Sequence, residues 1–371
     1  MISSYMEEET VNIENLLIAT AHPEFSQVAV AELQRLDKGL SSIEELEPGV
    51  ILCSVPDAAA FMTRAARQQP VFVRHLAPVQ TIVDLTGAAR DTGVIATSLA
   101  ALPAFALLER GIRFSVQSRL TQRDKQYGER AYSSGQLNQA LATAIAEETG
   151  AIEAIRKPQV VVSILCTMRK AYLGISPVEE NLSDWPGGNR HYARLPEQIS
   201  RAEFKLLEAL EVFDLSLPPR GRALDLGAAP GGWTRLLLEA GLQVVAVDPA
   251  SLDRRLAGRE GLEHYRGYAQ QYIDEAIKRH SRFAVIVNDM RMDARGAAHL
   301  LARAARCLTG DGFVVSVFKL PHATDEINPL TNFREALSIL DKSYGIVQAR
   351  QLFHNRQEVT VLAAQPLSRR A

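Results

Sequence analysis

Residues 224–248, LDLGAAPGGWTRLLLEAGLQVVAVD, place a glycine-rich turn between an apolar run and a helical run, and a second apolar run follows. The two apolar runs lead into Asp225 and Asp248. Glycine permits tight turns and lets a ligand approach bare backbone, and the N-terminus of a helix offers free N–H groups to that ligand. This succession predicts a buried strand, a ligand-binding turn, a helix and a second buried strand.

The same alternation continues from about residue 195 to the end of the chain. Helical runs separate further apolar runs such as FAVIVN and GFVVSVF. Alternating strands and helices build a parallel sheet that is covered by helices on both faces. We therefore expect an α/β domain of Rossmann-like fold over residues 195–371, with its ligands at the carboxyl ends of the strands.

The glycine-rich turn favours S-adenosylmethionine as the ligand. Asp248 lies 21 residues after Gly227 and one strand later, where a carboxylate can accept hydrogen bonds from both hydroxyls of a ribose. The sequence GAAPGG does not fit the G-x-G-x-x-G pattern of dinucleotide-binding turns, and it has a proline where that pattern has none. A dinucleotide is therefore the weaker alternative.

Two further domains are expected before residue 195. Residues 1–85 alternate strand-like and helical runs, which predicts a small α+β domain of the ferredoxin-like kind. Residues 86–190 contain a polar loop in which basic and tyrosine side chains interleave, a mixture that can hold phosphates and stack on bases. The candidate RNA-binding residues of this loop are Arg119, Arg123, Lys125, Tyr127, Arg130 and Tyr132. The segment NLSDWPGGNRHYARLPEQ reads as the linker to the last domain.

Charge and cysteine content narrow the class of protein. The formal net charge is -2, but residues 113–170 hold nine Lys or Arg against five Asp or Glu, so a local RNA-binding surface is possible. The three cysteines are scattered, which predicts neither disulfides nor a metal site. The N-terminus is acidic and no apolar run approaches the roughly 20 residues of a membrane span. We expect a cytoplasmic protein without a metal, and the oligomeric state stays open.

The last domain resembles the FtsJ type of ribose 2'-O-methyltransferase. The likeness is carried by DLGAAPGGW, by the helix SRAEFKLLEA, by VNDM and by NRQEVTVLA. Within this group, FKLPH, ARQLFHNRQEVTV and DWPGG are similar to the bacterial large-subunit (23S) rRNA cytidine 2'-O-methyltransferases. RFSVQSR, LNQALATAIAEETGA and KPQVVVSILCTMRKAYLGIS resemble a THUMP domain, an RNA-binding module that those enzymes also carry.

The resemblance implies a set of site residues. The family's catalytic Lys-Asp-Lys-Glu set falls on Lys205, Asp289, Lys319 and Glu358. The implied cofactor-binding residues are Ser200, Gly227, Ala229, Pro230, Gly231, Gly232, Trp233, Asp248, Tyr268 and Asp289. Two positions depart from the pattern: Ser316 stands where the FtsJ type has a lysine in its strand, and Tyr268 stands where the cytidine enzymes have an aspartate.

The chemistry of ribose methylation calls for such a set. A ribose hydroxyl is a poor acid and must lose its proton to a base as it attacks the methyl group. We expect Lys319 to be that base, with its pKa lowered by burial and by the neighbouring Lys205. Asp289 would orient Lys319, and Glu358 would hold Lys205. Two alternatives remain. An RNA base methyltransferase would resemble its class in a run of two prolines, which NDMRM lacks. A non-catalytic RNA-binding protein is disfavoured because both Lys205 and Lys319 are present.

Overall fold

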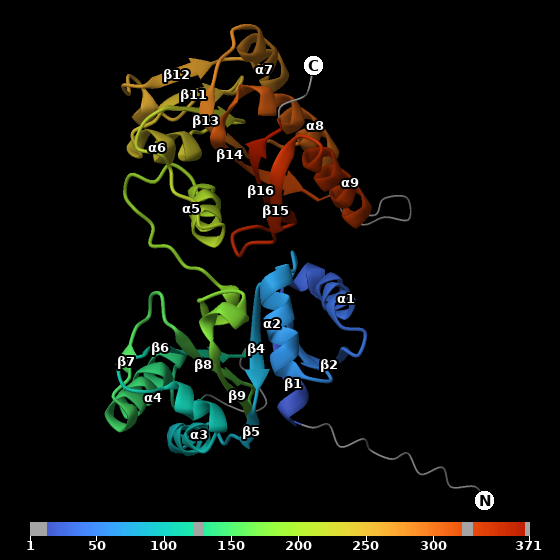
Figure 1. Ribbon diagram of the computed structural model, residues 1–371. Helices are drawn as coiled ribbons and strands as arrows, with labels where there is room; N and C mark the ends of the chain where they lie inside the picture. The colour runs from blue at the N-terminus through green and yellow to red at the C-terminus, as the bar shows by residue number, and fades with distance from the viewer. Residues whose placement is uncertain (1–12, 122–129, 321–328, 368–371) are drawn as a thin grey trace, which may run out of the picture. The chain divides into compact units, whose positions relative to one another are not determined.

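The structure is a computed structural model that describes residues 13–121, 130–320 and 329–367. The chain forms two compact units, residues 1–190 and residues 191–371. Each unit has its own sheets, helices and hydrophobic core (Figure 1).

The first sheet of unit 1 has four antiparallel strands in the order β2-β3-β1-β4. Its elements are β1 (Leu16–Thr20), α1 (Ser26–Leu36), β2 (Ser41–Glu47), β3 (Val50–Ser54), α2 (Ala58–Gln68) and β4 (His75–Val79). This β-α-β-β-α-β succession is the ferredoxin-like one. The N-terminal region is therefore α+β, as the sequence predicted.

The second sheet of unit 1 has five strands in the order β5-β9-β8-β6-β7. Its elements are β5 (Thr81–Asp84), α3 (Asp91–Ala100), β6 (Arg113–Leu120), α4 (Ser134–Thr149), β7 (Ile152–Glu153), β8 (Val160–Cys166) and β9 (Lys170–Pro177). Helix α4 begins at a capping box in which Ser133 and Gln136 bond each other's backbone N–H. Strand β5 lies within the expected first domain of residues 1–85 but pairs with β9. The division of residues 1–190 into two domains stays a prediction.

Unit 2 is built on a seven-stranded sheet in the order β12-β11-β10-β13-β14-β16-β15. Its elements are α5 (Glu203–Val212), β10 (Arg222–Leu226), α6 (Gly232–Glu239), β11 (Gln243–Val247), β12 (Leu262–Tyr265), α7 (Ala269–Lys278), β13 (Phe283–Asn288), α8 (Ala294–Ala304), β14 (Leu308–Lys319), α9 (Pro329–Asp341), β15 (Tyr344–Arg350) and β16 (Glu358–Pro366). Strands β10 to β14 are parallel, and β16 is antiparallel to both of its neighbours.

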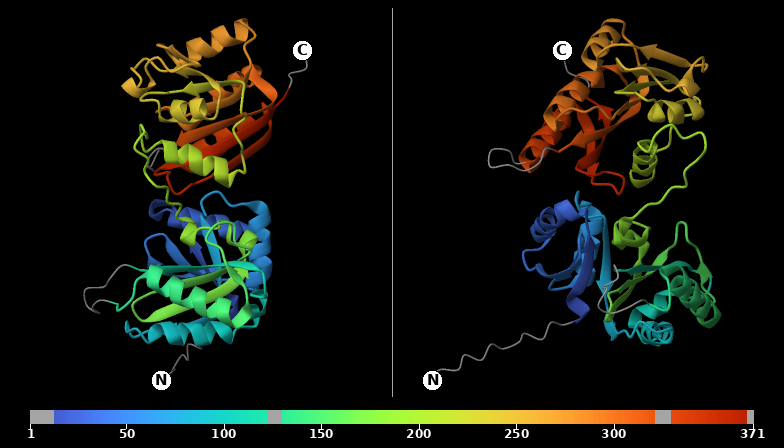
Figure 2. Two further views of the ribbon diagram at one scale, coloured as in Figure 1. Left: turned by 90° about the vertical axis from the view of Figure 1, so that its left-hand side faces the viewer. Right: turned by 180° about the vertical axis from the view of Figure 1, so that it is seen from behind.

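Helices cover both faces of this sheet, as Figures 1 and 2 show. Helices α5 and α6 lie on one face, where Leu206, Trp233 and Leu237 pack against the strands. Helices α7, α8 and α9 lie on the other face. The central strands are mostly apolar because both of their faces are buried. The predicted Rossmann-like α/β fold is confirmed, and its parallel strands end at one common edge.

Candidate active site

The turn after β10 requires glycine at two positions. Gly227 has φ +76° and Gly231 has φ +109°, a region that favours glycine. A Cβ added at Gly227 would lie 2.4 Å from Met290 Cγ, and one added at Gly231 would lie 2.3 Å from Leu256 Cδ1. The turn therefore lies closely against its neighbours, and helix α6 begins directly after it, at Gly232.

Asp248 faces this turn from the end of β11. Its carboxylate accepts hydrogen bonds from the backbone N–H of Ala229 (3.1 Å) and of Ala250 (2.8 Å). A carboxylate has about four acceptor positions, so two further hydrogen bonds can be accepted. This remaining capacity suits the two hydroxyls of a ribose.

Ser200 lies beside the start of helix α6. A Cβ added at Gly232 would lie 2.5 Å from Ser200 Oγ. That hydroxyl is buried and has no hydrogen-bond partner among the described residues. Glu203 holds the segment by accepting from the N–H of Ile199 (2.7 Å) and by pairing with Arg235. An orphaned hydroxyl beside helix N–H groups, together with Asp248, fits the polar groups of S-adenosylmethionine.

Two further predicted cofactor residues, Trp233 and Tyr268, differ widely in exposure. Trp233 is 4% exposed, packs in the core and donates from Nε1 to the Ala202 carbonyl (2.7 Å). Trp233 is therefore a core residue. Tyr268 is 64% exposed and precedes α7. Of the three remaining predicted residues, Ala229 and Pro230 lie within the turn itself, and Asp289 directly follows β13.

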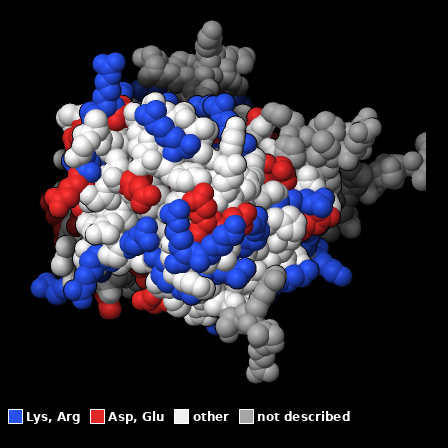
Figure 3. Space-filling model, turned by 90° about the horizontal axis from the view of Figure 1, so that it is seen from above, with Lys and Arg blue, Asp and Glu red and all other residues white. Residues whose placement is uncertain are grey.

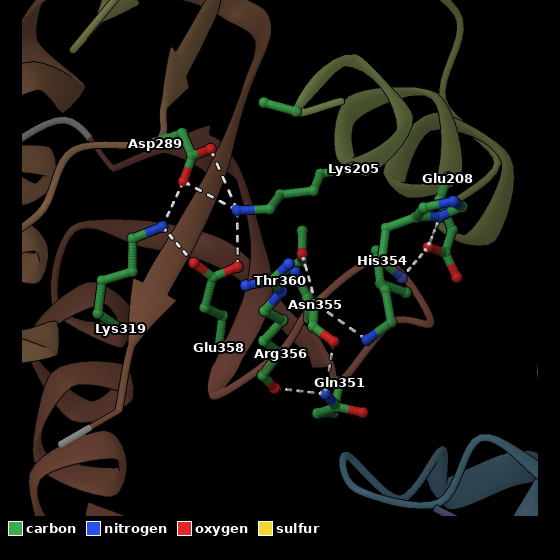
Figure 4. Close-up of polar contacts among 12 residues, drawn as sticks. Lys205, Glu208, Asp289, Lys319, Gln351, His354, Asn355, Arg356, Glu358 and Thr360 are labelled. Atoms are coloured by element: carbon green, nitrogen blue, oxygen red, sulfur yellow. Dashed lines mark hydrogen bonds and ion pairs between the residues drawn. The ribbon is translucent and has the colours of Figure 1, made fainter. Parts of the chain in front are cut away.

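Two lysines and two carboxylates form a closed ring at the same edge of the sheet (Figure 4). Lys319 Nζ lies 2.5 Å from Asp289 Oδ1 and 2.6 Å from Glu358 Oε1. Lys205 Nζ lies 3.2 Å from Asp289 Oδ2 and 2.6 Å from Glu358 Oε2. Asp289 directly follows β13, Lys319 ends β14, Glu358 begins β16 and Lys205 lies in α5. The structure thus brings together all four residues that the sequence singled out.

The ring sets the charge of its members. Burial alone would lower the pKa of Lys319, but Asp289 and Glu358 outweigh it and the pKa rises above its ordinary value. Burial alone would raise the pKa of Glu358, but Lys205 and Lys319 hold it below its ordinary value. The expected lowering of the Lys319 pKa by Lys205 is therefore wrong for this state, because two carboxylates lie between the lysines.

The structure describes three of the six candidate RNA-binding residues of unit 1, and each of the three contacts another group of the protein. Tyr132 is 8% exposed and donates its hydroxyl to Asp91 (3.1 Å), so the expectation that its ring stacks on a base is wrong. Arg119 pairs with Glu47 (2.6 Å), and Arg130 donates to two backbone carbonyls. The other three, Arg123, Lys125 and Tyr127, lie outside the described residues.

Two buried acids near the site had no role predicted from the sequence. Asp225, at 2% exposure, accepts from Thr234 Oγ1 (2.6 Å), and burial raises its pKa to about 7. Glu208 binds the turn between β15 and β16 through Phe353 and His354. The spacing of Glu208, three residues after Lys205 on one helix, was the signal that could have indicated it.

Within the described ranges, no helix is long and apolar enough to cross a membrane, and no group of three or more His, Cys, Asp or Glu side chains is placed to hold a metal ion.

Comparison with known proteins identifies the class of this domain. Residues 198–336 match the family described as FtsJ-like methyltransferase, so the chain carries an FtsJ-like methyltransferase domain. The chain is 36% identical over 207 residues to the ribosomal RNA large subunit methyltransferase M of Halorhodospira halophila (54% of this chain, 56% of that protein). It is 31% identical over 177 residues to the protein of the same name from Aeromonas salmonicida (45% and 46%). The chain thus spans about half the length of these curated relatives. Among solved structures, TrmN from Thermus thermophilus is similar at a TM-score of 0.40 and 19% identity, covering 94% of this chain and 99% of that one.

Proposed function

We propose that this chain is an S-adenosylmethionine-dependent ribose 2'-O-methyltransferase of a cytidine in large-subunit (23S) rRNA, acting in the cytoplasm. The observation that carries the proposal is the ring of Lys205, Asp289, Lys319 and Glu358 beside a glycine-rich turn at one edge of the sheet. Its relatives are named large subunit rRNA methyltransferases, which supports the choice of substrate.

The cofactor would be held by the residues around the turn. Asp248 would accept hydrogen bonds from its ribose, and Ser200 with the N-terminus of α6 would bind its polar end. When bound, S-adenosylmethionine supplies a methyl group on a sulfonium, which is open to attack by an oxygen nucleophile.

Lys319 would take the proton of the attacking hydroxyl at Nζ. Its raised pKa keeps it protonated at neutral pH, so the neutral, basic form is a minor one. Asp289 orients this nitrogen from one side and Glu358 from the other. Lys205 neutralises the same two carboxylates, so the ring stays electrically balanced in a partly buried site.

Unit 1 would help to hold the rRNA. We propose that residues 86–190 act as a THUMP-like module, supported by the excess of basic residues over 113–170. Lys and Arg side chains lie among Asp and Glu on the face in Figure 3, in keeping with a formal net charge of -2. The basic excess within 113–170 therefore supports a local site better than the overall charge does.

Labelled cofactor tests the proposal. Large-subunit and small-subunit rRNA from a strain without this protein are incubated separately with the enzyme and methyl-labelled S-adenosylmethionine. We expect label in the large-subunit RNA alone, at one position when the RNA is mapped by nuclease digestion. Label in neither RNA, or equally in both, would contradict the proposal.

A further inference from the structure

Helix α5 is joined at two levels to residues 351–358, which are the turn between β15 and β16 and the first residue of β16 (Figure 4). One is the pair of Lys205 with Glu358, at 2.6 Å. The other is Glu208, whose carboxylate accepts from the backbone N–H of Phe353 (2.8 Å), from that of His354 (2.9 Å) and from His354 Nδ1 (2.7 Å). Residues three apart lie on one side of a helix, so the two levels are one helical turn apart.

The contact of Glu208 is a demanding one. Glu208 is 2% exposed, and a carboxylate taken out of water is tolerated only when its oxygens are hydrogen-bonded. The three donors meet this need, and hydrogen bonds to a charged acceptor are stronger than those between neutral groups. The turn cannot shift along α5 without leaving the carboxylate or the N–H groups unsatisfied.

The turn is also fixed from within. Asn355 Oδ1 accepts from the Leu352 N–H (2.9 Å) and from Thr360 Oγ1 (3.0 Å). Gln351 Nε2 donates to the Arg356 carbonyl (3.0 Å). Hydrogen bonds therefore tie together residues 351–360, which include Glu358, and Glu208 links this segment to the helix that carries Lys205.

We propose that Glu208 and His354 are positioning residues for the methyl transfer, which set the place of Lys205 in the catalytic ring. The inference rests on the function proposed above. The Nζ of Lys205 is carried on a flexible four-carbon chain, so its position depends on where α5 lies relative to Glu358 and Asp289. A misplacement of about 1 Å in a catalytic group can cost on the order of 100-fold in rate.

A double-mutant cycle on the full-length chain tests this. Single-turnover rates at saturating rRNA and S-adenosylmethionine are compared for the wild type, Glu208→Gln, Lys205→Met and the double variant. We expect Glu208→Gln to slow transfer roughly 10- to 100-fold with unchanged affinity for S-adenosylmethionine, and to have less than about a 3-fold effect once Lys205 is methionine. Multiplicative losses would overturn the proposal.

Matched variants guard against a folding defect. His354→Gln removes only the side-chain donor and keeps the two backbone contacts, and we expect it to show the same coupling to Lys205 in weaker form. Glu211→Gln makes the same chemical change at an exposed position of α5 and should leave the rate unchanged. A loss in Glu211→Gln equal to that in Glu208→Gln would count against a specific role.

A titration followed by NMR gives a readout without catalysis. The Glu358 carboxyl carbon is assigned by comparison with Glu358→Gln, and its pKa is measured in each variant. Since Lys205 helps to hold the pKa of Glu358 low, we expect that pKa to rise in Glu208→Gln and to stay low in Glu211→Gln. If the wild type transfers no methyl group to rRNA, the proposed function fails, whereas an unchanged Glu358 pKa in Glu208→Gln overturns the positioning role itself.

Discussion

At the scale of single residues, Lys319 is the side chain on which the proposed chemistry depends. Loss of a positioned base costs about 100- to 10,000-fold in rate. We expect Lys319→Ala to lower the single-turnover rate by that order while calorimetry shows that S-adenosylmethionine and RNA still bind. A lysine that only contacted an RNA phosphate would instead raise KM and leave kcat intact. A near-normal rate would mean that another member of the ring acts as the general base.

The pH dependence of the reaction follows from the same side chain. Asp289 and Glu358 raise the pKa of Lys319 against its burial, so the free enzyme is protonated there at neutral pH. We expect kcat/KM to climb as pH rises from 7 to 9 without a plateau. Glu358→Gln removes one of the two charges that raise this pKa, so the rise in kcat/KM should level off at a lower pH than in the wild type. A profile that is flat from pH 7 to 9 in the wild type would contradict the role of Lys319 as base.

The sequence could indicate the ring but not its supports. Asp289 and Lys319 follow apolar runs, so their place at the carboxyl edge of a parallel sheet was predictable. The contact of Glu208 with His354 spans 146 positions and depends on how a turn packs, which no local pattern encodes. The polar segment around Tyr132 predicts an exposed ring, but the structure buries this ring beside Asp91.

At the scale of elements, the turn between β10 and α6 is the part of the site that tolerates least change. In Gly231→Val the added side chain would meet Leu256 at 2.3 Å and the residue would have to hold φ +109°. We expect no measurable binding of S-adenosylmethionine by calorimetry in a variant whose circular dichroism is unchanged. Gly310→Val is the control, because an added Cβ there meets no described atom within 4 Å. Wild-type affinity in a folded Gly231→Val would remove this turn from the cofactor site.

The elements themselves were predictable to different degrees. Strand β13 coincides with the run FAVIVN, and β14 contains GFVVSVFK but begins earlier, at Leu308. Both runs are largely apolar because both faces of these strands are buried. The placement of β16 between β14 and β15 was not predictable, since nothing local in the sequence of an antiparallel strand states its neighbours. For the same reason β5 could not be assigned to its sheet in advance.

At the scale of the whole molecule, unit 1 is expected to capture the RNA. If residues 86–190 bind phosphates, the affinity of the full chain for rRNA should fall steeply as salt rises from 50 to 200 mM. Binding to phosphates releases counterions from the RNA, and this release is less favourable at high salt. Residues 191–371 have their own core, and we expect this fragment to bind rRNA more weakly and with a shallower salt dependence. Equal methylation of rRNA by the fragment and the full chain would rule out a tethering role.

The chemical position of the transferred methyl group tests the central claim most directly. Large-subunit rRNA from a strain lacking this protein is treated with the enzyme and S-adenosylmethionine, digested to nucleosides and analysed by mass spectrometry. We expect one new nucleoside, a cytidine whose added methyl mass stays with the ribose when the base is cleaved off, and no such nucleoside with Lys319→Ala. A methyl group that leaves with the base would contradict ribose methylation by the Lys205, Asp289, Lys319 and Glu358 ring.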